Sequence, residues 1–393
     1  MPRPEFSKCS GSIKESFIMG LVEVASKPGM ISFATGLPDN NLLDPCALRD
    51  AMADVLDNDG PAALQYGPTS GYYGLKERVA ERCRRVLGVD AQAEDVFFTN
   101  GSQECFDQLG RMFLNRGDIM AVENPGYLGA IQSFTAYGPC LHGVDVDEHG
   151  PDMAMLESSV EDGAKLFYSI PNFQNPTGAS YSESARREVA SIIDGSSCLM
   201  IEDDAYGELS YDGSRRTVMK SLADDNTVLT GSFSKTISPG MRVGWMVVPE
   251  WMREHVNRSM EAASLQSNTF CQRVIDRFLE MNDYDRYLSH VRRGYREKRD
   301  IFMDAMDDLL PDTVTWNVPE GGMFVWLRTP PGTRAMRLHE LCLERGLVIM
   351  PGEPFHTHGG ENAIRLNFAT PDEDAILKGM HILGDVCRDL YGA

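Results

Sequence analysis

Six short, continuously apolar runs, separated by segments with a helical pattern, constrain the fold of this chain most. They span residues 95–100, 118–125, 165–171, 197–204, 227–235 and 242–250. A strand with one face in water alternates apolar and polar residues, whereas a strand covered on both faces is apolar throughout. Helical segments such as 103–117 and 182–195 lie between several of these runs. The alternation predicts an α/β domain with a mainly parallel, doubly wound sheet.

The pattern changes near residue 271. A long, charged helical segment is followed by the strand-like runs GGMFVWLR (321–328) and IRLNFAT (364–370) and a last helix. This order is typical of a smaller α+β domain. The first 44 residues are too short for a domain, so we expect them to pack against the rest. The sequence therefore predicts a segment at 1–44, a large domain at 45–270 and a small domain at 271–393.

Charge and cysteine usage exclude several classes of function. The chain has 37 basic and 58 acidic residues, a formal net charge of −21, which disfavours nucleic acid and anionic membrane surfaces as partners. Its nine cysteines are scattered, with no C-x-x-C pair, so neither a disulfide framework nor a zinc site is predicted. The N-terminus lacks an apolar signal stretch. We expect a cytoplasmic protein without a metal.

Polar residues collect at the carboxyl ends of the predicted strands, the edge where open α/β sheets bind ligands. In GSFSKTISPGMRVGW (231–245), Lys235 follows a strand and Arg242 comes seven residues later. Burial and a nearby cation both lower the pKa of a lysine, which makes its amine a better imine former. Ser232, Ser234 and Arg242 would cradle the phosphate of a cofactor that carries an aldehyde.

Two further strand ends suit the ring of such a cofactor. In IEDDAYG (201–207), Asp203 would keep a pyridine nitrogen protonated, and Tyr206 would hydrogen-bond a phenolic oxygen on the ring. In PNFQNPTG (171–178), the Asn175 side chain is a second partner for that oxygen.

Four other residues complete the pattern. The backbone N–H groups of Ser102 and Gln103 open a predicted helix, where phosphate binds well. Tyr127 follows another strand and could stack on the ring. Arg365 is a lone arginine in an apolar strand, and its burial requires an anion such as a substrate carboxylate.

Each pattern alone also has a structural interpretation. Lys235 could lie in a surface loop, Asp203 could bind magnesium or cap a helix, and Asn175 could simply form an Asn-Pro turn. Gly-Ser before a helix is often only a cap, Tyr127 could be a core residue, and Arg365 could form a structural salt bridge.

The order and spacing of these motifs resemble one family. Asn175, Asp203, Lys235 and Arg242 stand 28, 32 and 7 residues apart. Together with ISFATGLPD (31–39), VPEGGMFVWL (318–327), PGEPF (351–355) and other motifs, they make nearly the whole chain similar to the class I/II aminotransferases. The branch it resembles contains kynurenine/2-aminoadipate aminotransferase and the aminotransferase-like domains of bacterial regulators.

The resemblance implies fold type I and pyridoxal 5′-phosphate (PLP), held as a Schiff base on Lys235. It assigns the residues above the same roles, with Asn175 and Arg365 also facing the substrate. It adds Gly36, whose backbone faces the substrate carboxylate, and Tyr66, which reaches the phosphate of a neighbouring subunit. A homodimer is therefore expected, with segment 1–44 on the small domain or at the dimer interface. The expected partners are an amino acid and a 2-oxo acid.

Departures from the family pattern leave the substrate and the reaction open. Thr35 stands where a glycine is frequent, Phe173 and Gln174 are bulkier than usual, and SLQSNTFCQ (264–272) lacks a customary proline. Transamination is the predicted reaction. Elimination, replacement or carbon–carbon bond formation on PLP is the main alternative, because one fold hosts many chemistries. A non-catalytic PLP- or amino-acid-sensing module is a further alternative, although no basic helix-turn-helix pattern precedes residue 31.

Overall fold

The computed structural model describes residues 5–12 and 17–392, and its largest element is a seven-stranded sheet. In spatial order its strands are β2 (Val96–Thr99), β8 (Gly244–Val247), β7 (Thr227–Ser232), β6 (Leu199–Asp203), β5 (Leu166–Ser169), β3 (Ile119–Asn124) and β4 (Cys140–Asp145). The pairs from β7 to β4 are parallel, and within this sheet β8 runs antiparallel to both neighbours. The predicted mainly parallel α/β sheet is confirmed.

Helices cover both faces of this sheet, so its strands other than the edge strand β4 are almost entirely buried. In β5, Leu166 and Tyr168 belong to one apolar core, while Phe167 between them belongs to another. The first core includes residues of α5 (Ser102–Phe113), α6 (Leu128–Thr135) and α9 (Arg253–Ser264). The second includes residues of α7 (Met153–Glu161) and α8 (Glu183–Ile193). This alternation explains why the strands read as continuously apolar.

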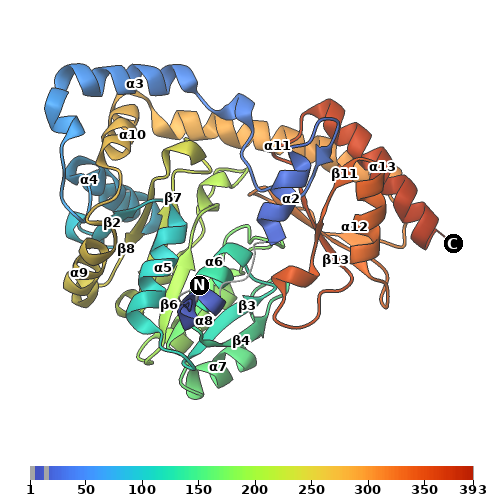
Figure 1. Ribbon diagram of the computed structural model, residues 1–393, viewed down its shortest axis with the longest axis horizontal. Coiled ribbons are helices and arrows are strands. Elements are labelled where there is room, and N and C mark those ends of the chain that lie inside the picture. Colours follow the sequence, from blue (N-terminus) through green and yellow to red (C-terminus); the bar gives the residue numbers. More distant parts are fainter. Residues whose placement is uncertain (1–4, 13–16, 393) are drawn as a thin grey trace.

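A third apolar core covers the β2 end of the sheet. Its helices are α3 (Pro45–Asn58), α4 (Tyr73–Arg82) and α10 (Thr269–Met281), at the upper left of Figure 1. Side-chain caps start two of them: the Asp44 carboxylate accepts a hydrogen bond from the Ala47 N–H, and the Asn268 side chain accepts one from the Cys271 N–H. Such caps satisfy N–H groups that have no partner within the helix.

The C-terminal part of the chain forms a second, antiparallel sheet, coloured orange and red on the right of Figure 1. Its strands are β12 (Met350–Pro351), β13 (Ala363–Asn367), β10 (Phe324–Arg328) and β9 (Thr315–Trp316), in that order. The helices α12 (Ala335–Glu344) and α13 (Glu373–Tyr391) contribute to its apolar core. The long helix α11 (Tyr284–Leu309) joins the two parts, because Tyr295 packs in the core of the large sheet and Phe302 in that of the second.

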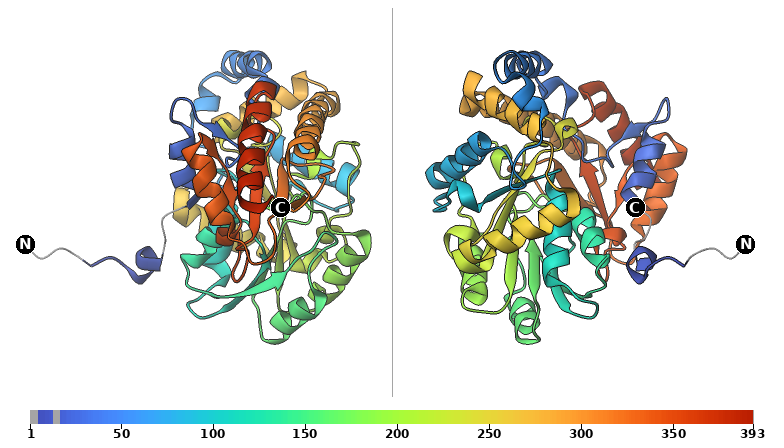
Figure 2. Two further views of the ribbon diagram at one scale, coloured as in Figure 1. Left: turned by 90° about the vertical axis from the view of Figure 1, so that its right-hand side faces the viewer. Right: turned by 60° about the vertical axis from the view of Figure 1, so that its left-hand side comes forward.

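The N-terminal segment contributes to the C-terminal part. The short strand β1 (Ile31–Ser32) pairs in parallel with β11 (Leu347–Val348). Helix α2 (Phe17–Ala25) precedes it, and Figure 2 shows α1 (Lys8–Ser12) standing off the rest of the fold. The predicted segment 1–44 is described except for residues 1–4 and 13–16, which lie outside the described residues. The domain limits predicted above remain a prediction, although the two sheets lie on either side of residue 271.

Candidate functional site

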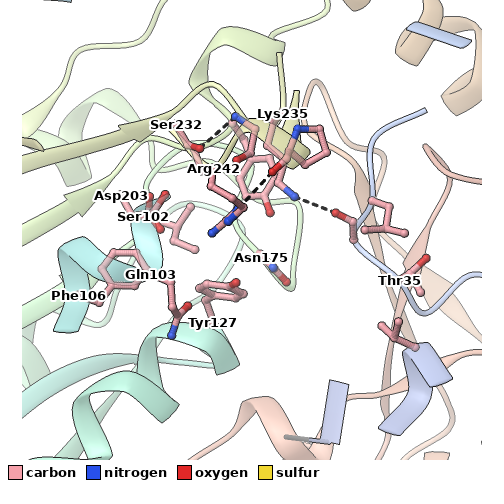
Figure 3. A pocket seen from close by; sticks show the side chains of 18 of the residues that line it. Thr35, Ser102, Gln103, Phe106, Tyr127, Asn175, Asp203, Ser232, Lys235 and Arg242 are labelled. Atoms are coloured by element: carbon pink, nitrogen blue, oxygen red, sulfur yellow. Dashed lines mark hydrogen bonds between the residues drawn. The ribbon is translucent and has the colours of Figure 1, made fainter. Parts of the chain in front are cut away.

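A cavity of about 330 Å³ brings together twelve of the thirteen predicted site residues. Such a volume is typical of small-molecule sites, which measure about 300–1,000 Å³. Figure 3 shows several of these side chains facing the cavity. The residues are Gly36, Ser102, Gln103, Tyr127, Asn175, Asp203, Tyr206, Ser232, Ser234, Lys235, Arg242 and Arg365. The thirteenth, Tyr66, does not line the cavity and is 78% exposed.

The topology of the sheet accounts for this convergence. The strands β3, β5, β6 and β7 are parallel, so their carboxyl ends meet at one edge. Asp203 is the last residue of β6, and β7 ends at Ser232. Asn175 lies in the loop after β5. Residues far apart in the chain therefore meet where open α/β sheets bind their ligands.

The amine of Lys235 is buried in this cavity beside two cations. Its Nζ donates a hydrogen bond to the Gly36 carbonyl oxygen at 2.8 Å. Burial, together with the charges of Arg365 and Arg242, lowers the pKa of Lys235 to about 8 against the opposing effect of Asp203. The lowered pKa increases the neutral fraction of the amine near physiological pH, and the neutral amine is the form that attacks an aldehyde.

Asp203 is fully enclosed and accepts hydrogen bonds from two hydroxyl groups. Tyr168 Oη donates to Asp203 Oδ2 at 2.7 Å, and Thr230 Oγ1 donates to Asp203 Oδ1 at 3.2 Å. Burial raises the pKa of Asp203 to about 6, while the two hydroxyls oppose the rise. Tyr168 is a site residue that was not predicted from the sequence. The available signal was a tyrosine inside an apolar strand, because a buried phenol requires a hydrogen-bond partner.

One end of the cavity is built for an anion. Helix α5 begins at Ser102, directly after Gly101, whose φ is 81°. A Cβ atom at Gly101 would collide with the Arg242 guanidinium, so glycine lets these two segments approach each other. Arg242 Nη2 donates to the Asn100 carbonyl oxygen at 3.0 Å. The Gln103 side chain donates a hydrogen bond to the Gly129 carbonyl oxygen at 2.6 Å. The backbone N–H of Gln103 lies in the first turn of the helix, where N–H groups have no partner within the helix.

Arg365 also lines the cavity and lies in the middle of β13. Its Nη1 donates to Asn175 Oδ1 at 2.8 Å, and its Nη2 donates to the Ala34 carbonyl oxygen. The guanidinium is held between the rings of Phe324 and Phe355, whose centroids lie 4.6 and 5.0 Å away. Burial lowers the pKa of Arg365 to about 10. No carboxylate of the described chain pairs with it, and its Nε is buried without a hydrogen-bond partner there.

The rest of the cavity wall is mainly apolar. Its residues were not predicted from the sequence. Met19 and Val22 come from α2, and Leu37, Phe106 and Ile170 complete this apolar wall. Among the lining residues, the cations are Lys235, Arg242 and Arg365.

The donor set matches the chemistry of PLP. An amine of lowered pKa could hold its aldehyde, a buried carboxylate could face its ring nitrogen, and a helix start with Arg242 could hold its phosphate. Arg365, with a buried N–H left unpaired, could bind a substrate carboxylate. No group of three or more potential metal ligands occurs in residues 5–12 and 17–392. None of the described helices is long and apolar enough to cross a membrane.

Comparisons with known proteins agree with this geometry. Residues 28–383 match the family model of aminotransferase class I and II. The chain is 36% identical to a 2-aminoadipate transaminase of Thermus thermophilus, over 98% of this chain and 97% of that protein.

Two solved structures superpose closely on the chain. An α-aminoadipate aminotransferase from Thermus thermophilus, complexed with N-(5′-phosphopyridoxyl)-L-leucine, has a TM-score of 0.90 and 35% identity, covering 98% of this chain and 97% of that one. A kynurenine aminotransferase from Pyrococcus horikoshii, complexed with pyridoxamine phosphate, has a TM-score of 0.93 and 31% identity, with 99% and 98% covered. Family, branch, fold type I and cofactor are thereby confirmed. The chain belongs to the class I and II aminotransferases and is a PLP-dependent transferase.

Proposed function

We propose that this enzyme moves the α-amino group of an L-amino acid to a 2-oxo acid, with PLP held as a Schiff base on Lys235. The observation that carries the proposal is the pairing, in one cavity, of a lysine of lowered pKa with an arginine that lacks a carboxylate partner in the described chain. The first suits imine chemistry at an amino group, and the second suits the carboxylate of the same substrate.

The other predicted residues would hold the cofactor. Asp203 would face the ring nitrogen, Tyr206 and Asn175 the phenolic oxygen, and Tyr127 one face of the ring. The phosphate would lie among Ser102, Gln103, Ser232, Ser234 and Arg242. When bound, PLP withdraws electrons from the α-carbon of the substrate and makes its C–H bond acidic.

The Lys235 amine would then serve as the proton carrier. When the amino group of the substrate is bound in its place, Nζ would be free to remove the α-proton and to give it back as a general acid. Its lowered pKa favours the neutral amine needed for the first of these transfers. Arg365 would hold the carboxylate so that the α-C–H bond stands perpendicular to the ring.

The apolar cavity wall favours the binding of substrates that have an apolar side chain. Among the described lining residues, Arg242 is assigned to the phosphate, Lys235 to the imine and Arg365 to the α-carboxylate, so no cation is left for a second carboxylate. Burying an unpaired polar group costs about 1–3 kcal/mol or more. We therefore expect aromatic or aliphatic amino acids to react with kcat/KM roughly 10–100-fold above that of aspartate.

A spectroscopic half-reaction tests this function and its substrate class. Holoenzyme is mixed with L-phenylalanine, L-leucine or L-aspartate without any oxo acid, and absorbance is followed from roughly 300 to 550 nm. We expect loss of the imine band and growth of a pyridoxamine phosphate band with the apolar substrates, reversed by a 2-oxo acid. Turnover without an oxo acid would instead indicate elimination or another non-transaminase reaction. Equal rates with aspartate would contradict the apolar substrate class.

We also propose a homodimer in which Tyr66 reaches the phosphate site of the partner subunit. Tyr66 is an exposed aromatic residue beside other exposed apolar side chains: Leu64 is 70% exposed and Leu265 51%. The Gly67 N–H donates to Gln266 Oε1, which brings these two loops together. An exposed apolar cluster of this kind is typical of an interface.

No disulfide joins the described cysteines, which supports a reducing, cytoplasmic location.

Replacing Tyr66 by phenylalanine is expected to weaken PLP binding roughly tenfold or more, because a hydrogen bond to a charged group contributes about 1.5–3 kcal/mol. Equilibrium dialysis of PLP with the apoenzyme measures the effect, and sedimentation velocity reports the oligomeric state. Tyr73→Phe is the control, since Tyr73 is exposed but lies outside the predicted site. A monomer in solution, or unchanged affinity in Tyr66→Phe, would refute the shared site.

A further inference from the structure

Tyr168 occupies the position from which one hydroxyl can control Asp203. It lies in β5, which pairs with β6, and its side chain extends to the end of β6. There Oη donates to Asp203 Oδ2 at 2.7 Å. Thr230, opposite Asp203 on β7, donates to the other carboxylate oxygen at 3.2 Å. All three residues are buried. Each carboxylate oxygen of Asp203 accepts one hydrogen bond from a hydroxyl group of the protein.

Aromatic packing holds the Tyr168 ring in place. The ring meets Phe106 edge-on, with centroids 5.2 Å apart and an interplanar angle of 78°. It also packs against Phe134, with centroids 5.9 Å apart. Phe106 lines the cavity, whereas Tyr168 is not among its lining residues. An effect of the Tyr168 hydroxyl on the site would therefore pass through Asp203, with which it forms a hydrogen bond.

We propose that Tyr168 is a positioning residue: its hydroxyl keeps the Asp203 carboxylate ionised and turned toward the ring nitrogen of PLP. The inference rests on the proposed function, which requires that ring nitrogen to be protonated. A buried carboxylate without donors would take up a proton, and a neutral Asp203 could no longer stabilise a charged pyridinium.

The electrostatic surroundings of Asp203 make this one hydroxyl important. Burial is the largest influence on the pKa of the carboxylate and raises it, and the hydrogen bonds from Tyr168 and Thr230 are the next largest and lower it, with a net pKa of about 6. The other titratable groups around it are Glu123, Asp204, Tyr127, Tyr206, Cys105 and Lys235. The negative charges of Glu123 and Asp204 oppose the ionisation of Asp203, whereas the positive charge of Lys235 favours it. Loss of the Tyr168 hydroxyl would therefore raise the pKa of Asp203 and increase the protonated, uncharged fraction of its carboxyl group.

The test is Tyr168→Phe, prepared as holoenzyme and titrated by absorbance at the imine band. A deprotonated ring nitrogen withdraws less charge from the imine, so we expect the imine titration to move to higher pH. The acid limb of the pH–rate profile of the amino-acid half-reaction should also move to higher pH. The affinity of the apoenzyme for PLP should fall roughly tenfold. Thr230→Val removes the longer hydrogen bond and should shift the titration in the same direction by a smaller amount.

Tyr181→Phe is the matched control. Tyr181 is another buried tyrosine, and its hydroxyl donates to a buried carboxylate, Glu123, but it does not contact Asp203. It should lose comparable thermal stability and leave the imine titration at its wild-type position. If Tyr168→Phe and Thr230→Val both titrate like Tyr181→Phe, the positioning role is wrong. Failure of the proposed function itself is distinguishable in wild-type protein supplied with PLP, which would then show no imine band or would turn over amino acid without any oxo acid.

Discussion

Replacing Lys235 by alanine is expected to lower the rate of the amino-acid half-reaction by roughly 10⁴-fold or more, the upper range for loss of a general acid–base group. The variant loses both the imine to PLP and the amine that carries the α-proton. Within the described part of the chain Nζ has one hydrogen bond, to the Gly36 carbonyl oxygen, so little of the fold depends on it. Stopped-flow absorbance with L-phenylalanine measures the rate, and borohydride reduction followed by mass spectrometry measures the covalent attachment of PLP.

Lys76→Met is the control for this experiment. Burial also lowers the pKa of Lys76, but its Nζ bonds Ser70 Oγ at 3.0 Å and the residue lies in α4, outside the cavity. This variant should be labelled by PLP and borohydride like wild type. Labelling of Lys235→Ala at another lysine, with retained turnover, would contradict the assignment.

The same lysine sets the pH dependence of cofactor loading. The pKa of Lys235 is about 8, and the neutral amine is the species that attacks the aldehyde. The rate at which apoenzyme takes up PLP should therefore rise with pH through about 8 and level off above it.

The large sheet was predictable because covered strands carry a simple signal. Six of its seven strands coincide with the apolar runs named above. The missed strand, β4, lies at the edge of the sheet, and Cys140 and Asp145 at its two ends are exposed. A half-exposed edge strand lacks a continuous apolar run, so periodicity alone does not reveal it. The reversed direction of β8 was likewise not predictable, because apolar character carries no information about strand direction.

The site was predictable only where its residues follow strand ends or familiar motifs. Asp203 and Lys235 satisfy that condition, and the cavity contains both. Met19 and Val22 do not, because they come from a helix whose docking depends on tertiary contacts. Tyr168 was hidden for a different reason: its position within a strand suggests core packing, and only the structure shows that its hydroxyl reaches the carboxylate on the next strand.

Replacing Arg365 by alanine should lower kcat/KM for L-phenylalanine by roughly 10²–10⁴-fold. Two hydrogen bonds to a charged group contribute about 1.5–3 kcal/mol each, and about 1.4 kcal/mol corresponds to a factor of ten. The change also removes a guanidinium packed against Phe324 and Phe355 and takes one hydrogen-bond donor from Asn175. Lost packing alone could therefore slow the enzyme, so the experiment must separate packing from carboxylate recognition.

A substrate that lacks the carboxylate makes this separation. 2-Phenylethylamine is L-phenylalanine without its carboxyl group, so it cannot use Arg365. Damage from lost packing should slow both compounds equally, whereas loss of carboxylate recognition should slow only the amino acid. The preference of the wild type for phenylalanine should therefore nearly vanish in Arg365→Ala and survive in part in Arg365→Lys, which keeps the charge but not the bidentate geometry. If the preference persists unchanged in Arg365→Ala, another group binds the carboxylate, and the unpaired Nε of Arg365 has no part in substrate binding.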